Sequence, residues 1–125
     1  MRTVLLVDDD PLVLSVLDRI LRSAPEAWQV TTARGGAEAI QLVRDSPFDL
    51  VITDIQMPDP NGLEIVREAR RRESSTKIVA MTGGGQLDEA ESNRALLALG
   101  AHEVLQKPFT AQALLAVARR WLGAE

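Results

Sequence analysis

Six polar side chains stand directly after apolar stretches of the sequence, where short strands would end. They are Asp8, Asp9, Asp10, Asp54, Thr82 and Lys107. Carboxylates gathered without thiols or imidazoles are hard oxygen ligands, which favour Mg²⁺ or Mn²⁺ over zinc. A metal beside a lysine suggests phosphate chemistry, in which an aspartate can act as a nucleophile and form an aspartyl phosphate. Lys107 and the Thr82 hydroxyl could then stabilise the charge that accumulates on the phosphoryl oxygens.

Short apolar stretches rich in β-branched residues alternate with longer amphipathic stretches along the whole chain. The short stretches predict strands, at residues 3–7, 28–32, 50–53, 78–81 and 103–106. The longer stretches carry apolar residues at helical spacing and predict helices, at residues 11–23, 36–44, 61–72, 87–99 and 110–122. Each predicted strand is therefore followed by a helix.

Five repeats of this unit predict an α/β fold with a parallel sheet, right-handed crossovers and helices on both faces. They fit a flavodoxin-like doubly wound sheet with the strand order 2-1-3-4-5. With 125 residues, 46% of them hydrophobic, the chain has room for one domain over residues 1–125. Strands one and three are neighbours where this order reverses, and such sheets bind ligands there. We therefore expect Asp8 and Asp9 beside Asp54, with a cation to offset their repulsion.

Local signals separate Asp10 from the other two aspartates of the run. Asp10 precedes a proline at the first position of a predicted helix, so we expect it to cap that helix. Asp8 and Asp9 are more carboxylates than capping requires, and we assign them to function. Thr110 is expected to cap the last helix, and Gly100 to end the fourth.

The composition excludes several classes of function. The chain contains no cysteine, which rules out disulfides, thiolate metal sites and thiol nucleophiles. The net charge of −4 argues against direct binding of nucleic acid, because that requires a concentrated positive surface. No apolar run is long enough to cross a bilayer, so we expect a cytoplasmic protein without membrane contact.

The one basic cluster falls late in the third predicted helix, at Arg67, Arg70, Arg71 and Arg72. Cations there favour the negative end of the helix dipole, and we interpret the cluster as a solvated helix terminus. The single histidine, His102, has no second imidazole with which to build a metal site. We interpret His102 as structural.

The motifs around the six polar residues resemble those of the response-regulator receiver family of two-component signalling, of the single-domain chemotaxis-regulator type. The matching segments are VLLVDDDP at 4–11, DLVITD at 49–54, MP at 57–58, NGL at 61–63, MTG at 81–83 and KPF at 107–109. Each motif alone is weak evidence. In this order and at these spacings they are specific, and the resemblance runs over nearly the whole chain.

The resemblance implies a bound Mg²⁺ ion. By position, the carboxylates of Asp9 and Asp54 and the backbone carbonyl of Gln56 would be ligands, and Asp8 would act largely through metal-bound water. The positions of Gln56 and Gly84 are those at which the family's side chains tune the lifetime of the aspartyl phosphate.

The resemblance also implies that Asp54 accepts a phosphoryl group from a sensor histidine kinase or a histidine phosphotransfer protein. Thr82 would hydrogen-bond the phosphoryl group, Lys107 would pair with it, and the peptide between Lys107 and Pro108 would be cis. The protein would then be a signalling switch that catalyses its own phosphorylation and dephosphorylation. As a monomer or weak homodimer, it would bind a downstream target protein through its fourth helix and fifth strand, because no output domain follows the last predicted helix.

Two other hypotheses remain open. A haloacid-dehalogenase-like phosphatase also uses aspartate, Mg²⁺, a threonine or serine and a lysine, and its nucleophile would be Asp8. However, Leu12 occupies the last position of its Asp-x-Asp-x-Thr/Val pattern. A receiver-shaped module that signals without phosphorylation is suggested by Val104, which stands where receivers commonly carry Tyr or Phe. Valine has one stiff side-chain torsion and cannot make the movement of an aromatic ring.

Overall fold

Five parallel strands form one sheet in the order β2-β1-β3-β4-β5. The computed structural model describes residues 2–58, 60–72, 75–83 and 89–123, with the side chains of 89–92 left out. The strands are β1 (Thr3–Val7), β2 (Gln29–Ala33), β3 (Leu50–Asp54), β4 (Lys77–Thr82) and β5 (Glu103–Gln106). The predicted fold class and strand order are confirmed.

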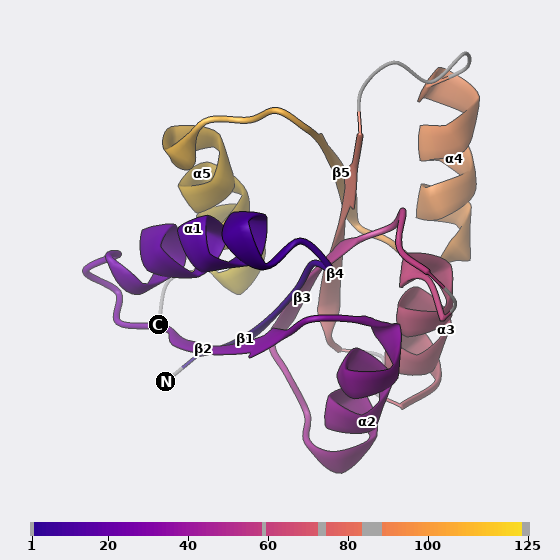
Figure 1. Ribbon diagram of the computed structural model, residues 1–125, viewed down its shortest axis with the longest axis horizontal. Coiled ribbons are helices and arrows are strands. Elements are labelled where there is room, and N and C mark those ends of the chain that lie inside the picture. The colour runs from indigo at the N-terminus through magenta and orange to yellow at the C-terminus, as the bar shows by residue number, and fades with distance from the viewer. Residues whose placement is uncertain (1, 59, 73–74, 84–88, 124–125) are drawn as a thin grey trace.

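A helix follows each strand. The helices are α1 (Pro11–Arg22), α2 (Gly36–Asp45), α3 (Gly62–Arg72), α4 (Glu89–Leu99) and α5 (Ala111–Leu122). In Figure 1, α1 and α5 cover one face of the sheet, and α2, α3 and α4 cover the other. The predicted start of the fourth helix at residue 87 lies outside the described residues. None of the described helices has both the length and the apolar composition that crossing a bilayer requires.

The core lies in two layers, one on each side of the sheet. Consecutive strand residues point to opposite faces, so Val4 and Leu6 pack in the layer under α1 and α5. Leu5 and Val7 pack in the layer under α2, α3 and α4. All five residues of β3 are buried. Burial on both faces explains why β3 is continuously apolar from Leu50 to Ile52.

The predicted caps define the helix ends near the sheet. The Asp10 carboxylate accepts a hydrogen bond from the Leu12 amide at 3.0 Å, and the Thr110 hydroxyl accepts one from the Ala113 amide at 3.0 Å. Gly100 follows α4 with a φ of 127°, a left-handed conformation that glycine adopts without the steric cost of a Cβ. These three predictions are confirmed, and Asp10 therefore has a structural role at the start of α1.

Candidate functional site

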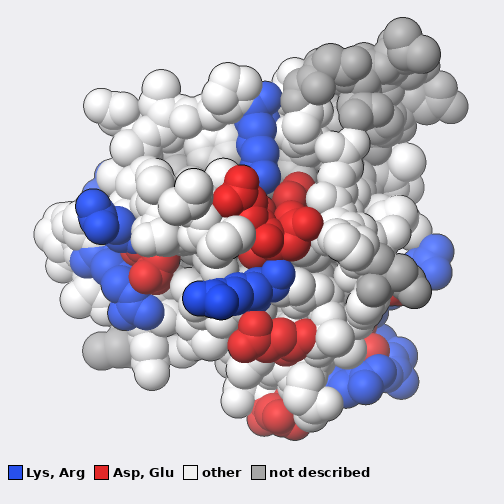
Figure 2. All heavy atoms as spheres, viewed as in Figure 1, with Lys and Arg blue, Asp and Glu red and all other residues white. Residues whose placement is uncertain are grey.

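Three carboxylates meet at the carboxyl edge of the sheet. Asp8, Asp9 and Asp54 each place an oxygen within 4.8 Å of the others. Asp8 and Asp9 follow β1, and Asp54 ends β3, which pairs with β1 so that Val7 lies opposite Thr53. Figure 2 shows acidic side chains near the centre of this view, with basic side chains on either side. The structure thus brings together the carboxylates that the sequence assigned to neighbouring strand ends.

Lys107 reaches this acidic group from the end of β5. Its Nζ lies 2.8 Å from Asp8 Oδ2 and 3.4 Å from Asp54 Oδ2. Its backbone amide donates to the Thr82 carbonyl at 2.7 Å, which ties the chain after β5 to the end of β4. The peptide between Lys107 and Pro108 is cis, as the resemblance implies. One ammonium therefore bridges two carboxylates.

Burial sets the electrostatics of the site. The exposed fraction of Asp8 is 0% and that of Asp54 is 6%, whereas Asp9 is exposed. Burial raises the pKa of Asp54, and the charge of Asp8 adds to this, although Lys107 and the Gln56 amide partly oppose the rise. Burial would lower the pKa of Lys107, but its hydrogen bond with Asp8 and the charges of both aspartates outweigh burial and raise it. Lys107 therefore offsets only part of the cost of burying the charge of Asp54.

The two buried carboxylates are held differently. Asp8 Oδ1 accepts a hydrogen bond from the Asp10 amide at 2.9 Å, and Asp8 Oδ2 accepts one from Lys107 at 2.8 Å. Asp54 Oδ1 accepts from the Gln56 amide at 3.3 Å, and Asp54 Oδ2 lies 3.4 Å from the lysine. Because short hydrogen bonds to charged groups are the stronger ones, Asp8 is held tightly and Asp54 loosely.

Thr82 stands at the end of β4, on the strand next to β3. Asp54 lies opposite Met81, so Thr82 is one residue beyond the level of Asp54. Its side chain is half-buried. Gly84, the second position assigned to tuning the phosphoryl lifetime, lies outside the described residues.

The donor set fits a hard divalent cation. The three clustered ligand groups are all carboxylates, and Lys107 is the residue that forms ion pairs with two of them in the described part of the chain. Carboxylate oxygens are ligands that Mg²⁺ prefers, and the ion usually keeps several waters that a phosphate can replace. The chemistry of the residues is therefore compatible with Mg²⁺ and unsuited to a soft metal.

Two residues outside the acidic group have packing roles. The Nδ1 of His102 accepts a hydrogen bond from the Ile78 amide at 3.0 Å, in accord with its structural interpretation. Val104 lies opposite Ala80 and packs against the core layer under α2, α3 and α4. The side chain at the position that commonly holds a receiver's aromatic ring is therefore a half-buried part of the core.

The ion pair between Lys107 and Asp8 is a feature that sequence reasoning missed. The sequence indicates Lys107 as a counter-charge for the acidic sites and for a phosphoryl group, but it does not identify which carboxylate the lysine pairs with. Its partner lies 99 positions away along the chain. The available signal was the shared sheet edge, which already placed both residues at strand ends.

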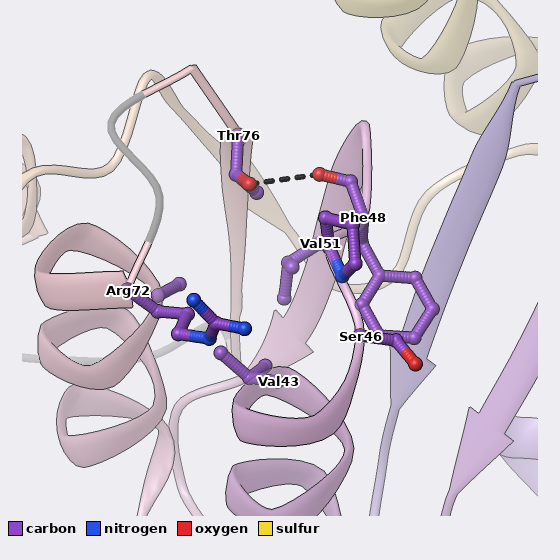
Figure 3. A pocket seen from close by; sticks show the side chains of 8 residues that line it. Val43, Ser46, Phe48, Val51, Arg72 and Thr76 are labelled. Carbon is purple, nitrogen blue, oxygen red and sulfur yellow. Dashed lines mark hydrogen bonds between the residues drawn. The ribbon is translucent and has the colours of Figure 1, made fainter.

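A small hollow lies between the ends of α2 and α3 and the start of β3, and Figure 3 shows its lining. It leaves a free volume of about 10 Å³, room for about one water molecule. Its walls are mostly apolar, and the Thr76 hydroxyl at its margin donates to the Phe48 carbonyl at 2.8 Å. The groups suited to phosphate chemistry are at the carboxyl edge instead.

Known proteins are similar to this chain over most of its length. Residues 4–119 match the family model described as the response regulator receiver domain. The chain is 36% identical over 125 residues to the sensor protein GacS of Pseudomonas syringae pv. syringae, covering 96% of this chain and 13% of that protein. It is 34% identical over 116 residues to the transcriptional regulatory protein CpxR of Escherichia coli (strain K12), covering 93% of this chain and 47% of that protein. The chain thus spans less than half of either relative.

A solved structure is similar over its whole length. The Vibrio cholerae chemotaxis protein CheY4 superposes with a TM-score of 0.86 at 31% identity. The match covers 98% of this chain and 99% of that chain. The similarity therefore includes the sheet edge at which the acidic group and Lys107 lie.

Proposed function

Because the chain belongs to the response regulator receiver domain family, we propose that it accepts a phosphoryl group on Asp54 in a Mg²⁺-dependent reaction. The donor would be the phosphohistidine of a sensor histidine kinase or of a histidine phosphotransfer protein. The P–N bond of the donor breaks as a P–O bond to Asp54 forms. The proposal rests above all on Lys107, whose ammonium lies within 3.4 Å of Asp54 in a group of three carboxylates.

Asp54 is better suited than Asp8 to be the nucleophile. Both oxygens of Asp8 accept short hydrogen bonds, from Lys107 and from the Asp10 amide. The contacts of Asp54 are longer, at 3.3 and 3.4 Å, so less is lost when one of its oxygens attacks phosphorus. This difference favours a receiver over a phosphatase of the haloacid-dehalogenase type.

Asp8, Asp9 and Asp54 would hold Mg²⁺, with the carbonyl of Gln56 as a further ligand. When bound, the ion would offset the negative charge of the carboxylates and of the phosphoryl oxygens. Asp8 keeps Lys107 at the site through their 2.8 Å contact. Asp9, the exposed member of the three, is the carboxylate that an arriving ion would meet at the surface.

Lys107 and Thr82 would stabilise the transferred group. The lysine ammonium already lies between two carboxylates, so a small movement would let it pair with a phosphoryl oxygen on Asp54. Thr82, on the adjacent strand, would donate its hydroxyl hydrogen to a second phosphoryl oxygen. Charge stabilisation of this kind accounts for most of the catalysis in phosphoryl transfer.

An apolar patch on α1 could receive the donor protein. It forms a shallow hollow of about 260 Å³ lined by Leu12, Val13, Val16 and Leu17. Leu12 is 77% exposed and follows the Asp10 cap by two residues, so the patch adjoins the acidic group. A partner that covered the patch would bury apolar surface while presenting its phosphohistidine to Asp54.

Phosphorylation would then change the binding of a downstream target protein. The proposed switch is a receiver domain over residues 1–125, acting as a monomer or weak homodimer in the cytoplasm. The absence of cysteine is compatible with that compartment. A surface around α4 and β5 is proposed as the responding part, since β5 connects directly to Lys107.

Labelling with a small phosphodonor tests the proposal. The protein is incubated with acetyl phosphate, with Mg²⁺ or with EDTA, and the adduct is measured by intact mass. We expect an adduct only with Mg²⁺, none on Asp54→Asn, and a normal adduct on the control Asp45→Asn, which alters an exposed aspartate of α2. An equal adduct on Asp54→Asn and the wild type would contradict the assignment.

The two alternatives give different results in related assays. Turnover of a phosphomonoester that survives Asp54→Asn but not Asp8→Asn would identify a phosphatase. A module that signals without phosphorylation would bind its partner equally with and without Mg²⁺ and beryllofluoride, a phosphate mimic. We expect instead that beryllofluoride with Mg²⁺ shifts the amide resonances around Asp54, Thr82 and Lys107.

A further inference from the structure

We propose that the groove between α2 and α3 binds an acidic segment of a partner protein. The groove has a volume of about 360 Å³ and is lined by Ile40, Arg44, Glu64, Arg67, Glu68 and Arg71. Its residues belong to α2 and α3 and are distinct from the acidic group at the carboxyl edge. The inference concerns an interaction that does not require phosphoryl transfer.

The groove is positive on a protein that is negative overall. Three of its lining residues are arginines and two are glutamates, and Arg72 joins them by donating from Nε to the Arg44 carbonyl at 3.1 Å. The whole chain has a net charge of −4. Figure 2 shows basic side chains, with an acidic one among them, on the α2 and α3 side of the molecule. The positive charge is therefore local, which favours complementary binding at this place.

Glu68 positions two of the arginines. Its mostly buried carboxylate lies 3.3 Å from Nε of Arg44, in α2, and 2.9 Å from Nη2 of Arg71, which is in α3 like Glu68 itself. Hydrogen bonds from Arg44 and then from Arg71 hold the pKa of Glu68 below its ordinary value. The Arg71 side chain nevertheless remains 73% exposed. A guanidinium has five N–H donors, so each arginine keeps donors for an incoming carboxylate, in a conformation that is already ordered.

Arg67 has no such partner. It is exposed, and it makes no ion pair or side-chain hydrogen bond with any residue that the structure describes. The basic residues of the last turn of α3 are Arg70, Arg71 and Arg72. Interaction with the helix dipole is confined to that turn, so the interpretation as a helix terminus accounts for those three residues and leaves Arg67 unexplained. A carboxylate of a partner could pair with this exposed guanidinium.

The shape and charge favour a short protein segment over nucleic acid. Arginine pairs with a carboxylate through two parallel hydrogen bonds, and Ile40 offers apolar contact in the same groove. Nucleic acid would instead extend past the groove onto the rest of a negatively charged surface. Glu64 would repel an acidic segment, so acidic residues are expected nearest Arg44, Arg67 and Arg71.

Titration with fluorescein-labelled octaglutamate at low salt tests this proposal. Amide shifts followed by NMR on the full chain should map to α2 and α3, and fluorescence polarisation gives the affinity. Arg67→Glu should weaken binding about fivefold or more, whereas Arg94→Glu, the same charge change on α4, should alter it less than about twofold. Glu64→Gln should strengthen binding.

Several results would overturn the proposal. These are no binding of octaglutamate by the wild type, equal losses in Arg67→Glu and Arg94→Glu, or tighter binding of duplex DNA than of octaglutamate at the same sites. Arg44→Gln with Arg71→Gln provides a second test that introduces no negative charge. Labelling of Asp54 by acetyl phosphate is measured on the same variants. Normal labelling would show that a variant is folded and keeps the proposed function, whatever its affinity for octaglutamate.

Discussion

Lys107 and Asp8 form an ion pair with an Nζ–Oδ2 distance of 2.8 Å across the carboxyl edge of the sheet. Asp8 is fully buried, so its negative charge would be costly without this partner. The same ammonium lies 3.4 Å from Asp54. The positive charge of the lysine therefore occupies the region in which the proposed metal ion would bind.

Replacement of Lys107 by Met should affect stability and metal binding in opposite directions. Without Mg²⁺, the variant leaves the buried charge of Asp8 without its lysine, and we expect a loss of about 3 kcal/mol in the free energy of unfolding. Mg²⁺ should bind severalfold more tightly, because a nearby positive charge is gone. Urea unfolding in EDTA and isothermal titration calorimetry measure the two effects. The control is Lys77→Met, at the start of β4; weaker Mg²⁺ binding in Lys107→Met would contradict the prediction.

Replacement of Asp54 by Asn should stabilise the metal-free protein at neutral pH. Because burial raises the pKa of Asp54 above its ordinary value of 3.8, the folded state favours the protonated carboxyl. The contribution of this group to stability is present below pH 3.8 and is lost as the pH rises through the folded-state pKa. At pH 7 we expect Asp54→Asn to gain on the order of 1 kcal/mol, or about 4 °C in Tm.

Thermal unfolding in EDTA over a range of pH checks this result. The advantage of Asp54→Asn should shrink as the pH falls toward 3.8, where the wild-type carboxyl is protonated. Asp45→Asn is the control for removal of an exposed negative charge. An advantage that stays constant with pH would mean that burial of the Asp54 charge is not its cause.

Asp9 and Asp10 should respond to substitution in different ways. Asp10 caps α1 through the amides of Leu12 and Val13, so Asp10→Ala should cost about 1 kcal/mol in stability. Its labelling by acetyl phosphate should be unchanged. Asp9→Ala should leave stability intact and reduce Mg²⁺ affinity at least about tenfold, because it removes a proposed ligand. Calorimetry and urea unfolding of the two variants distinguish helix capping from metal binding. A loss of Mg²⁺ binding in Asp10→Ala but not in Asp9→Ala would mean that the two roles are assigned the wrong way round.

Gly36 and Gly35 form a matched pair for testing the loop before α3. A Cβ on Gly36 would overlap the carbonyl oxygen of Pro60, whereas a Cβ on Gly35 would meet nothing within 4 Å. We expect Gly36→Ala to cost about 1–3 kcal/mol and Gly35→Ala, at the N-cap of α2, about 1 kcal/mol or less. Gly36→Ala should also slow labelling, since Pro60 belongs to the loop between β3 and α3 that also carries Gln56. Equal stability of the two variants would show that the loop adjusts without cost.

Much of the fold could be predicted because two different periodicities mark the strands and helices. The strand ends do not follow from hydrophobicity alone, since strand length also depends on pairing with the neighbouring strand. β4 begins at Lys77, a residue outside the apolar run, because Lys77 lies opposite Leu50 of β3. β2 lies one residue later than predicted, from Gln29 to Ala33, and Trp28 before it is buried in the core.

The proximity of the carboxylates followed from topology, because neighbouring parallel strands end at one edge. The contacts between helices did not. Glu68 pairs with Arg44 of α2, and helical periodicity identifies the buried side of each helix without naming the residue that faces it. For the same reason, the basic cluster of α3 could be located from the sequence, while the pairing of Glu68 with Arg44 across the two helices could not.

The central position of β3 limits which parts of the protein could move when a phosphoryl group is attached to Asp54. β3 is hydrogen-bonded to β1 on one side and β4 on the other, so the backbone that carries Asp54 has little freedom to move. A phosphoryl group adds close to two negative charges there. The middle of the sheet would stay in place, and any movement caused by the phosphoryl group would occur at the edge of the sheet. There, β5 pairs with a strand on one side only.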